Sequence, residues 1–222
     1  MKSIAIDGPA GAGKSTIAQS VAKSLGFIYV DTGALYRAVG LFALREGIPH
    51  TDEDALISRL PEVKVELAYR DGLQLIFLGG LDVTGEIRGP QMGNIASDVS
   101  AFPGVRDFLL GMQREMAGKH NVIMDGRDIG TVVLPGADLK IFLTATPEDR
   151  AKRRHLEFTA KGNNISYEQV LEDIKRRDAN DMGRATAPLK PAPDAVILDT
   201  TGNEFQQSVD LVLRVIRERG IA

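Results

Sequence analysis

The chain of 222 residues contains no cysteine, which excludes disulfide bonds and metal sites built on thiolates. Its three histidines, His50, His120 and His155, are far apart and do not have the spacing of metal ligands. The N-terminal region also lacks a long apolar run, because Asp7 interrupts the first apolar segment. We therefore expect neither a signal peptide nor a membrane-spanning segment, and a cytoplasmic protein.

Strong positive charge is a second feature that the chain lacks. Its formal net charge is −3 at pH 7, whereas general nucleic-acid binders are usually basic, so we expect no nucleic-acid partner. Residues 150–190 are an exception, with 10 lysines and arginines against 6 acidic residues. Two interpretations stay open for this stretch: a site for an anionic ligand, or a solvated helix of mixed charge.

The most informative stretch that is present is residues 8–15, Gly-Pro-Ala-Gly-Ala-Gly-Lys-Ser. It fits the pattern of a phosphate-binding loop, a glycine and four residues followed by Gly-Lys-Ser. An apolar segment precedes it at 3–6, and apolar residues recur at helical spacing over 17–25, so the loop joins a strand to a helix, as this motif requires. In such a loop Lys14 contacts the β- and γ-phosphates and the Ser15 hydroxyl lies on Mg²⁺. The sequence therefore predicts a bound nucleoside triphosphate with Mg²⁺.

Strands and helices alternate along most of the remaining chain. At this length, and with 43% hydrophobic residues, we expect one α/β domain of the P-loop NTPase type. Its parallel sheet of about five strands should have helices on both faces and ligands at the carboxyl ends of the strands. The predicted strands are residues 3–6, 27–30, 122–124, 139–143 and 196–198, and the predicted helices are 34–46, 52–60, 90–100, 103–117, one from 147, one from 166, and 204–217.

One region does not follow this alternation. Apolar and polar side chains alternate at 63–67 and again at 73–77, on either side of an Asp-Gly pair, which is the signal of a β-hairpin. Residues 81–83 are a candidate third short strand. We interpret residues 63–87 as a small β insertion.

Arginines gather near the predicted carboxyl ends of the strands. A guanidinium group suits bidentate contact with phosphate, so the set indicates a second phosphorylated ligand, although a surface salt bridge explains each arginine taken alone. The arginines concerned are Arg37, Arg106, Arg127, Arg150, Arg153, Arg154, Arg176, Arg177 and Arg184.

Other functions of phosphate-binding loops fit the chain less well. A GTPase switch needs an Asn-Lys-x-Asp stretch, and the chain has no Asn-Lys pair. A motor or transport ATPase would have little room for partner-binding modules in 222 residues. A kinase of a small alcohol, such as shikimate or gluconate, needs an aspartate base, for which Asp31 is available, but does not need so many arginines. A phosphate acceptor explains the arginines and needs no base; a nucleotide-dependent binding module remains the alternative outside enzymes.

Several stretches resemble bacterial cytidylate kinases, in the order in which that family has them. They are residues 31–37 (Asp-Thr-Gly-Ala-Leu-Tyr-Arg), 85–88, 126–133, 140–143, 150–154, 177–189, 194–195 and 199–201. The resemblance covers nearly the whole chain and implies transfer of a phosphoryl group from ATP to CMP or dCMP by a monomer. It also implies a single domain over 1–222, in which 63–87 is the family's β insertion and 150–165 an arginine-rich lid.

The resemblance further implies roles for individual residues. ATP would be bound by Gly8, Pro9, Ala10, Gly11, Ala12, Gly13, Lys14, Ser15 and Thr16. CMP would be bound by Thr32, Arg37, Ser97, Arg106, Arg127, Asp128, Arg177, Asp181 and Arg184. The catalytic groups would be Lys14, Arg127, Arg150, Arg153 and Arg154, and Ser15 would contact Mg²⁺ through ATP. For Asp125 two roles stay open: holding Mg²⁺ through a water, or anchoring the helix after the loop.

Hydrogen-bond chemistry gives independent support for cytosine. Cytosine offers an amino donor beside two acceptors, whereas uracil has a carbonyl where the amino group stands. A carboxylate at Asp128 can accept from the amino group but would face the uracil carbonyl lone pair to lone pair. We therefore expect CMP and dCMP to be preferred over UMP. Two alternatives stay open: Asp128 orients Arg127 instead, and Ser97 is an ordinary hydroxyl on a helix surface.

Overall fold

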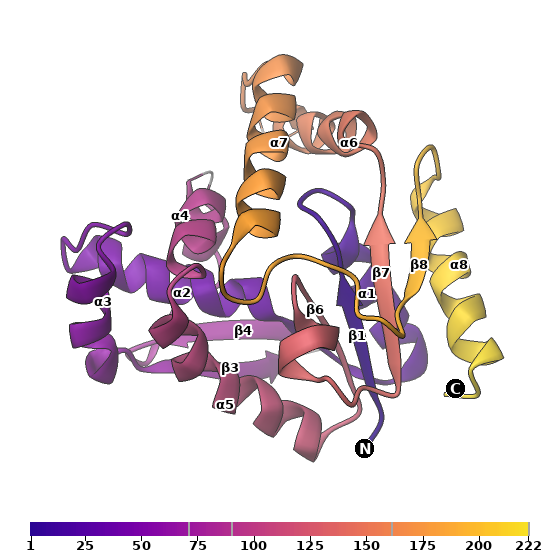
Figure 1. Ribbon diagram of the computed structural model, residues 1–222, viewed down its shortest axis with the longest axis horizontal. Coiled ribbons are helices and arrows are strands. Elements are labelled where there is room, and N and C mark those ends of the chain that lie inside the picture. Colours follow the sequence, from indigo (N-terminus) through magenta and orange to yellow (C-terminus); the bar gives the residue numbers. More distant parts are fainter. Residues whose placement is uncertain (71, 90, 161, 222) are drawn as a thin grey trace.

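The computed structural model describes residues 1–70, 72–89, 91–160 and 162–221. Its centre is a sheet of five parallel strands in the order β2-β6-β1-β7-β8 (Figure 1). The strands are β1 (Ser3–Asp7), β2 (Ile28–Asp31), β6 (Val122–Gly126), β7 (Leu139–Thr144) and β8 (Val196–Asp199). The α/β class and the five predicted strands are thus confirmed.

Side chains of the central strands alternate between the two faces of the sheet, as the period of two along a strand requires. Ile4 and Ile6 of β1 pack with Ile123 of β6 on one face. Ala5 packs with Met124 on the other. All five residues are fully buried, which explains why the first strand reads as a continuous apolar run instead of an apolar–polar alternation.

Helices cover both faces of this sheet. The face that carries the isoleucines of β1 is covered by α1 (Lys14–Leu25) and α8 (Phe205–Glu218). The opposite face is covered by α5 (Pro103–Lys119) and by η3 (Ile129–Val133), a single π-helical turn. This three-layer arrangement buries both faces of the sheet and leaves the carboxyl ends of its strands accessible to ligands.

A second hydrophobic core extends from the β2 edge of the sheet. It joins α2 (Thr32–Arg45), α3 (Glu53–Arg59), α4 (Met92–Val99) and the inner face of α5. Two short 3₁₀ turns, η1 (Leu60–Glu62) and η2 (Glu86–Arg88), connect these elements. Pro90, with which the fourth predicted helix was expected to begin, lies outside the described residues.

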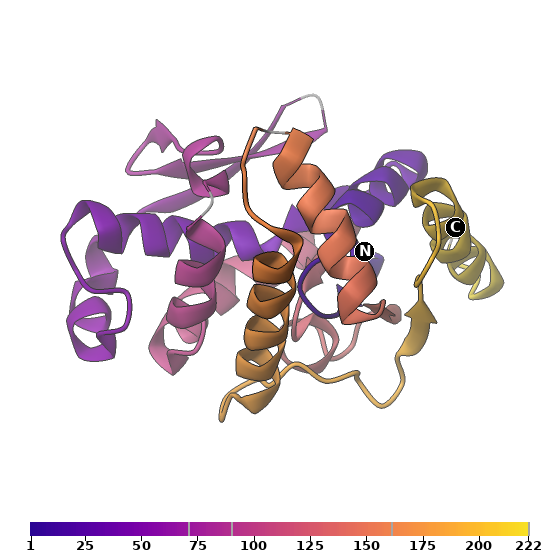
Figure 2. The same cartoon turned by 90° about the horizontal axis from the view of Figure 1, so that it is seen from above.

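A small antiparallel sheet packs on this second core. Its strands are β3 (Val65–Arg70), β4 (Leu73–Leu78) and β5 (Leu81–Asp82), in the order β3-β4-β5. The predicted hairpin and third strand are therefore confirmed, although Asp71 of the predicted turn lies outside the described residues. Figure 2, which shows the molecule from above, places the β3–β4 hairpin at the edge of the molecule. The Asp31 N–H at the end of β2 donates a hydrogen bond to the Gln74 side chain of β4 at 2.7 Å, so the two sheets are in contact.

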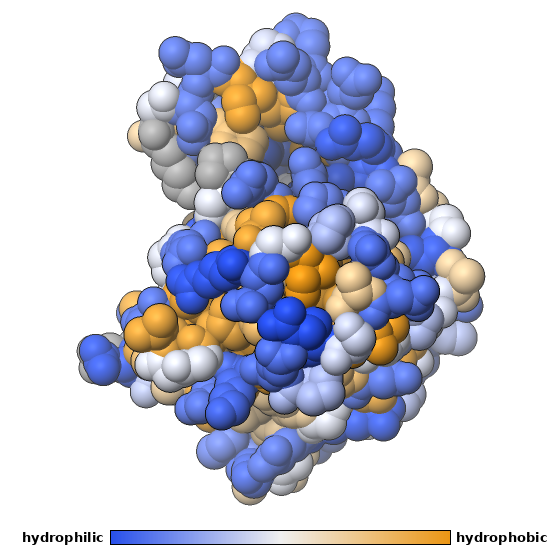
Figure 3. Space-filling view, turned by 90° about the vertical axis from the view of Figure 1, so that its left-hand side faces the viewer, coloured by the Kyte–Doolittle hydropathy of each residue, from blue (hydrophilic) through white to orange (hydrophobic). Residues whose placement is uncertain are grey.

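Two helices that cross each other, α6 (Pro147–Ala160) and α7 (Tyr167–Gly183), stand over the carboxyl ends of the central strands (Figures 1 and 2). They pack together through Ala151, Val170 and Ile174. In Figure 3 they form the upper lobe, which an indentation sets off from the rest of the molecule. In the described part of the chain, no helix is both long and apolar enough to cross a membrane.

Side-chain caps explain where several helices begin. Asp52 caps α3 by accepting a hydrogen bond from the backbone N–H of Ala55 at 3.1 Å. Ser166 and Gln169 form a reciprocal capping box at the start of α7. Asp31 ends β2 and caps α2 at 3.0 Å, so the chain turns from strand to helix without a loop.

Gly40 sets the distance between α2 and α4. A Cβ atom on this buried glycine would lie 2.5 Å from Cγ2 of Ile95, which is closer than nonbonded carbon atoms approach. We expect Gly40→Ala to lower the free energy of unfolding by about 1–3 kcal/mol through overpacking, measured by urea denaturation.

Gly111, in the exposed middle of α5, provides the matched control. A Cβ atom there would meet nothing within 4 Å, so Gly111→Ala should raise the free energy of unfolding by about 0.5–1 kcal/mol through helix propensity. Wild-type stability in Gly40→Ala would contradict the close packing of α2 on α4.

Candidate active site

A cleft of about 610 Å³ opens at the carboxyl ends of the central strands, where a parallel sheet of this kind binds ligands. The predicted site residues that line it are Ala10, Gly11, Ala12, Gly13, Lys14, Ser15, Thr16, Thr32, Arg37, Ser97, Arg106, Asp125, Arg127, Asp128, Arg154, Arg177, Asp181 and Arg184. Four predicted site residues are absent from its described lining: Gly8, Pro9, Arg150 and Arg153.

Two glycines shape the phosphate-binding loop between β1 and α1. Gly8 has a φ of +149°, and a Cβ atom there would lie 2.0 Å from the carbonyl oxygen of Leu143, so glycine is needed where the loop passes β7. Gly13 has a φ of +81° and precedes the first turn of α1, which among the described residues has no side-chain cap. The N–H groups of this uncapped turn favour an anion.

Lys14 is the buried cation of the loop. It is 5% exposed, and its ammonium group donates a hydrogen bond to the Pro9 carbonyl at 2.7 Å. Burial, and next the positive charge of Arg127, lower the pKa of Lys14 to about 7. An anion beside the ammonium group would favour its charged form and compensate for the lost solvation.

Asp125, at the end of β6, faces the same loop. One carboxylate oxygen accepts a hydrogen bond from the Ser15 hydroxyl at 2.8 Å, and the other accepts from the Tyr29 hydroxyl at 2.8 Å. Burial, reinforced by the negative charge of Asp31, raises the pKa of Asp125 to about 6. The Ser15 and Asp125 oxygens are the type of ligand that Mg²⁺ prefers, and the same bond ties α1 to β6, so both roles of Asp125 fit the geometry.

Asp181, on α7, gathers several polar side chains around one buried carboxylate. It accepts a hydrogen bond from Nε of Arg127 at 2.7 Å and another from the Ser97 hydroxyl at 3.4 Å, and it forms an ion pair with Arg184. Burial opposes ionisation of Asp181, but the charges of Arg127 and Arg184 outweigh it and lower its pKa. One carboxylate thus joins residues from α4, the end of β6 and the end of α7.

Arg106 and Asp128 form a buried ion pair at the back of the cleft. Arg106 also donates to the Ser100 carbonyl at 3.1 Å, and its guanidinium carbon lies 5.7 Å from the centre of the Tyr36 ring, within range of a cation–π interaction. The alternative in which Asp128 orients Arg127 is not what the structure shows, because Arg127 bonds to Asp181. Asp128 orients Arg106 instead.

Thr32 and Arg37 come from the first turns of α2. The Thr32 hydroxyl donates to the backbone carbonyl of Asp125 at 2.7 Å. Arg37 forms an ion pair of 2.7 Å with Asp31, whose second carboxylate oxygen caps α2. Both oxygens of Asp31 are therefore engaged, which weakens its candidacy as a general base for an alcohol.

Arg177, on α7, has a hydrogen-bond donor without an acceptor among the described residues. Its Nε atom is buried and has no hydrogen-bond partner among the described residues. Burial, and next the positive charge of Arg127, lower the pKa of Arg177 to about 10. A buried donor without a partner is unusual, and in a cleft it indicates that a ligand completes the site.

The structure corrects the position expected for Arg150. It was predicted to lie in the lid over the transferring phosphate, but its guanidinium group is buried against the loop, where it donates to the carbonyls of Ala10 and Ala145 at 2.8 Å each. It also forms an ion pair of 2.7 Å with Asp178, which accepts from the Ala10 N–H at 3.3 Å. Arg150 and Asp178 thus hold both backbone polar groups of Ala10.

The other two predicted lid arginines, Arg153 and Arg154, point to different parts of the structure. Arg153 donates to the Thr200 carbonyl and pairs with Asp149, each at 2.5 Å, because it lies on the side of α6 that faces the end of β8. Arg154 lines the cleft and stacks on Phe158, with 4.4 Å between the guanidinium carbon and the ring centre. Among the three, Arg154 is the lid arginine whose position fits contact with a ligand.

A family model described as cytidylate kinase matches residues 4–218. The chain belongs to the cytidylate kinase family. Its relatives include a cytidylate kinase of Caldicellulosiruptor bescii, 52% identical over 212 residues, which are 96% of this chain and 94% of that protein. A cytidylate kinase of Desulfitobacterium hafniense is 49% identical over 216 residues, 97% of this chain and 93% of that protein.

Solved structures share the fold of this cytidylate kinase family member at much lower identity. An uncharacterized protein from Eubacterium ventriosum has a TM-score of 0.55 at 11% identity, covering 98% of this chain and 99% of that chain. A gluconokinase from Sinorhizobium meliloti has a TM-score of 0.51 at 16% identity, covering 98% and 92%. At these identities the two structures establish the fold alone.

Some residues of the site were not predicted. Arg88 and Tyr36 line the cleft and lie in stretches that resemble cytidylate kinases, and this resemblance is the signal in the sequence that points to them. Asp178 lies in such a stretch as well, yet nothing in the sequence shows that it contacts Ala10. Arg176, which was counted among the strand-end arginines, lies on the outer side of α7 and pairs with Asp173.

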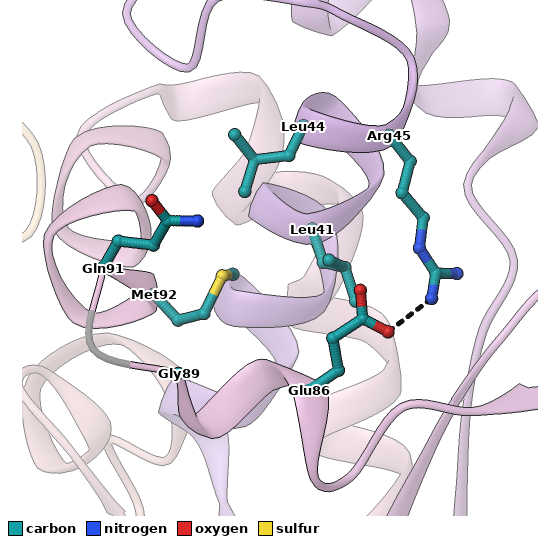
Figure 4. Close-up of a pocket in the computed structure, with 7 residues that line it drawn as sticks. All are labelled: Leu41, Leu44, Arg45, Glu86, Gly89, Gln91 and Met92. Atoms are coloured by element: carbon teal, nitrogen blue, oxygen red, sulfur yellow. Dashed lines mark hydrogen bonds and ion pairs between the residues drawn. The ribbon is translucent and has the colours of Figure 1, made fainter.

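A second pocket, of about 380 Å³, lies between α2 and α4 (Figure 4). Leu41, Leu44 and Met92 contribute its apolar wall, and an ion pair of 2.6 Å between Arg45 and Glu86 closes one side. None of the predicted site residues lines the described part of this pocket. The predicted site residues that line one of these two pockets therefore all line the larger cleft.

The buried charge of Lys14 has a measurable cost. Because the folded pKa of about 7 lies below the ordinary value of 10.5, Lys14 binds more protons in the unfolded chain between these values, and its contribution to the stability of the wild type rises with pH across that interval. We expect Lys14→Met to raise the free energy of unfolding at pH 7 by about 1–2 kcal/mol, with a gain that disappears above pH 10.5.

Lys23, on the exposed side of the same helix, provides the control. Lys23→Met should leave the urea midpoint and its pH dependence unchanged. A Lys14→Met variant less stable than the wild type at pH 7 would contradict the proposed cost of burial.

Proposed function

We propose that the protein transfers the γ-phosphoryl group of ATP to CMP or dCMP, giving ADP and CDP or dCDP. One observation carries this proposal: a single cleft has a phosphate-binding loop on one side and several arginines on the other. Phosphoryl transfer to a phosphate acceptor requires two anions held in line across one space. The name of the relatives, cytidylate kinase, supports the choice of acceptor.

ATP would be bound by the loop from Gly8 to Thr16. Lys14 now donates to a neutral carbonyl, and the charged phosphate oxygens of ATP would be stronger acceptors for it. Gly8 and Pro9 would contribute through the shape of the loop. Arg150 would keep the loop in place through its bond to Ala10.

A magnesium ion with ATP fits the donors on this side of the cleft. Ser15 and Asp125 would hold it, Ser15 directly and Asp125 directly or through a water, because their oxygens are adjacent and face the loop. When bound, Mg²⁺ supplies positive charge against the negative charge that develops on the β- and γ-phosphate oxygens.

The acceptor phosphate would lie among Arg37, Arg127 and Arg177, beside Thr32. The unpartnered Nε of Arg177 supports this placement, as does the position of all three arginines along the cleft. Their positive charge would offset the repulsion between donor and acceptor phosphates and stabilise the transition state. No general base is needed, because the attacking phosphate oxygen is already anionic.

The cytosine base would be read by Asp128, Arg106 and Ser97. Asp128 would accept from the amino group, while Arg106 and Ser97 would donate to the ring acceptors. Asp181 and Arg184, which are paired with each other, would contact the sugar. The buried pair of Arg106 and Asp128 supports this assignment, since it holds a donor and an acceptor side by side.

Arg154 would be the catalytic arginine of the lid. It projects into the cleft from α6, within the segment 150–165 that we propose as the lid of a single domain 1–222. Closure of this lid over the cleft would bring Arg154 to the transferring group and exclude water, which suppresses hydrolysis of ATP.

The experiment that tests the function measures ADP release with ATP and Mg²⁺ in a coupled assay. CMP, dCMP, UMP, AMP and shikimate are offered in parallel as acceptors. We expect rapid turnover with CMP and dCMP and slow turnover with UMP. If ADP is released with only one of the other acceptors, that acceptor would replace CMP in the proposal. If ADP is released with none of them, a nucleotide-dependent binding module would be favoured.

Asp128→Asn tests the base reader within the same assay. The asparagine amide can present its N–H₂ group to the uracil carbonyl, so the ratio of kcat/KM for CMP over UMP should fall about ten- to hundredfold. Asp107→Asn, a neighbour of Arg106 on the exposed side of α5, is the matched control and should keep the wild-type ratio. An unchanged ratio in Asp128→Asn would remove Asp128 from the base site.

Arg154→Ala and Arg150→Ala should distinguish an arginine that acts in catalysis from one that supports the phosphate-binding loop. Arg154→Ala should lower kcat by about a hundredfold with an unchanged midpoint of unfolding, because it removes a charge that acts on the transition state. Arg150→Ala should raise KM for ATP and destabilise the fold by about 3–5 kcal/mol, because it leaves the largely buried Asp178 carboxylate without its partner.

Arg176→Ala, on the outer side of α7, is the control for both variants. It should leave kcat, KM for ATP and the free energy of unfolding unchanged. Wild-type stability in Arg150→Ala would mean that its contacts with Ala10 and Asp178 do not support the loop.

A further inference from the structure

Asp7 is a buried carboxylate that has no role in the function proposed above. It is the last residue of β1, directly before the phosphate-binding loop, and is 3% exposed. In the sheet it stands in register with Gly126 of β6 and with Phe142 of β7. A carboxylate at the centre of a parallel sheet is costly to bury unless its oxygens are satisfied.

Both oxygens of Asp7 are satisfied by one turn of backbone. One oxygen accepts from the N–H of Ile129 at 2.7 Å, and the other accepts from the N–H of Gly130 at 2.7 Å. These are the first two amides of the π-helical turn η3. The first N–H groups of a helical turn have no partner within the turn, so Asp7 acts as a cap supplied from a neighbouring strand.

The residue that would ordinarily cap this turn is Asp128. Aspartate at this position usually accepts from the amides that follow it, but in the described structure the Asp128 side chain makes no such bond. It pairs with Arg106 at the back of the cleft instead. Asp7 therefore accepts the hydrogen bonds of the first two N–H groups of the turn, whereas the Asp128 carboxylate faces the cleft.

The geometry requires a carboxylate at position 7 and a small residue at position 130. A carboxylate offers two acceptor oxygens to two neighbouring N–H groups, whereas an asparagine would turn its N–H₂ group toward one of them. A Cβ atom on Gly130 would lie 3.3 Å from Asp7 Oδ2 and 3.1 Å from Cδ of Lys140, so glycine permits this close approach.

We infer that Asp7 is a positioning residue that caps η3 in place of Asp128 and thereby aims the Asp128 carboxylate at the base of the acceptor. The inference rests on the proposed function, because it assigns to Asp7 the orientation of the base reader. It links the two substrates, since the residue that precedes the ATP loop fixes the turn that reads cytosine.

Asp7→Asn tests the inference through selectivity. We expect KM for CMP to rise and the ratio of kcat/KM for CMP over UMP to fall about tenfold. A defect in folding alone would lower activity toward both acceptors equally. Retention of the wild-type ratio in a folded Asp7→Asn protein would overturn the inference.

The double variant Asp7→Asn/Asp128→Asn shows whether Asp7 acts through Asp128. If it does, adding Asp7→Asn to Asp128→Asn should reduce the CMP/UMP ratio no further, because the effects of coupled residues are not additive. A further tenfold fall in the double variant would overturn the positioning role.

Two additional variants keep the test decisive. Asp138→Asn is the matched control, because the Asp138 carboxylate likewise accepts a hydrogen bond from a backbone N–H, that of Ser3 at 2.8 Å, but at the opposite end of β1; this variant should keep the wild-type ratio. If Asp7→Asn does not fold, Gly130→Ala replaces it, because its Cβ pushes the turn away from Asp7 without removing a polar group. Gly130→Ala should lower the ratio severalfold, and an unchanged ratio would overturn the inference.

The same measurements separate the inference from the proposed function. A wild-type protein that does not turn over CMP would overturn both, whereas one that turns over CMP and UMP equally would overturn the base-reading role of Asp128 and with it the inference. A wild type that prefers CMP, with the expected loss in Asp128→Asn and no loss in Asp7→Asn, would overturn the role of Asp7 alone.

Discussion

The physical constraint on which this site depends is the repulsion between arginines that must share one cleft. Positive charges at short range destabilise each other, and their burial adds a desolvation cost. The structure compensates with a carboxylate for most of the arginines. The pairs are Asp31 with Arg37, Asp128 with Arg106, and Asp181 with both Arg127 and Arg184. The carboxylates therefore determine where the positive charge of the cleft is held.

Helix α7 connects the two halves of the cleft because of the spacing of its acidic residues. Asp178 and Asp181 are three residues apart and lie on neighbouring parts of the same helix face. Asp178 holds the Ala10 backbone of the phosphate-binding loop together with Arg150. Asp181 holds Arg127 and Arg184 on the side of the arginine cluster. A rigid helix thus fixes the distance between the loop and the arginines, which in-line transfer between two phosphates requires.

Much of the fold follows from patterns that act over short stretches of sequence. The apolar run at 3–6 and the Gly-Lys-Ser motif define a strand, a loop and a helix, because each depends on neighbouring residues. The directions of long side chains depend on distant partners and could not be predicted. Arg150 was expected over the phosphate, yet its backbone position lets it reach Ala10 and Asp178 instead. The capping of η3 by Asp7 could not be predicted from the sequence for the same reason, since Asp7 and Ile129 are 122 positions apart.

Stability and ligand binding oppose each other at two cations of this cleft. Burial lowers the pKa of Lys14 and of Arg177, which means that each charge is less favourable here than in water. Replacing them by apolar side chains would relieve this cost, but the cleft would lose its attraction for phosphate. A bound phosphate would reverse the balance, because it would supply both the opposite charge and the acceptor that the Arg177 Nε lacks among the described residues. In the proposed function, the same two side chains whose burial costs stability in the absence of substrate would give the site its affinity for phosphorylated ligands.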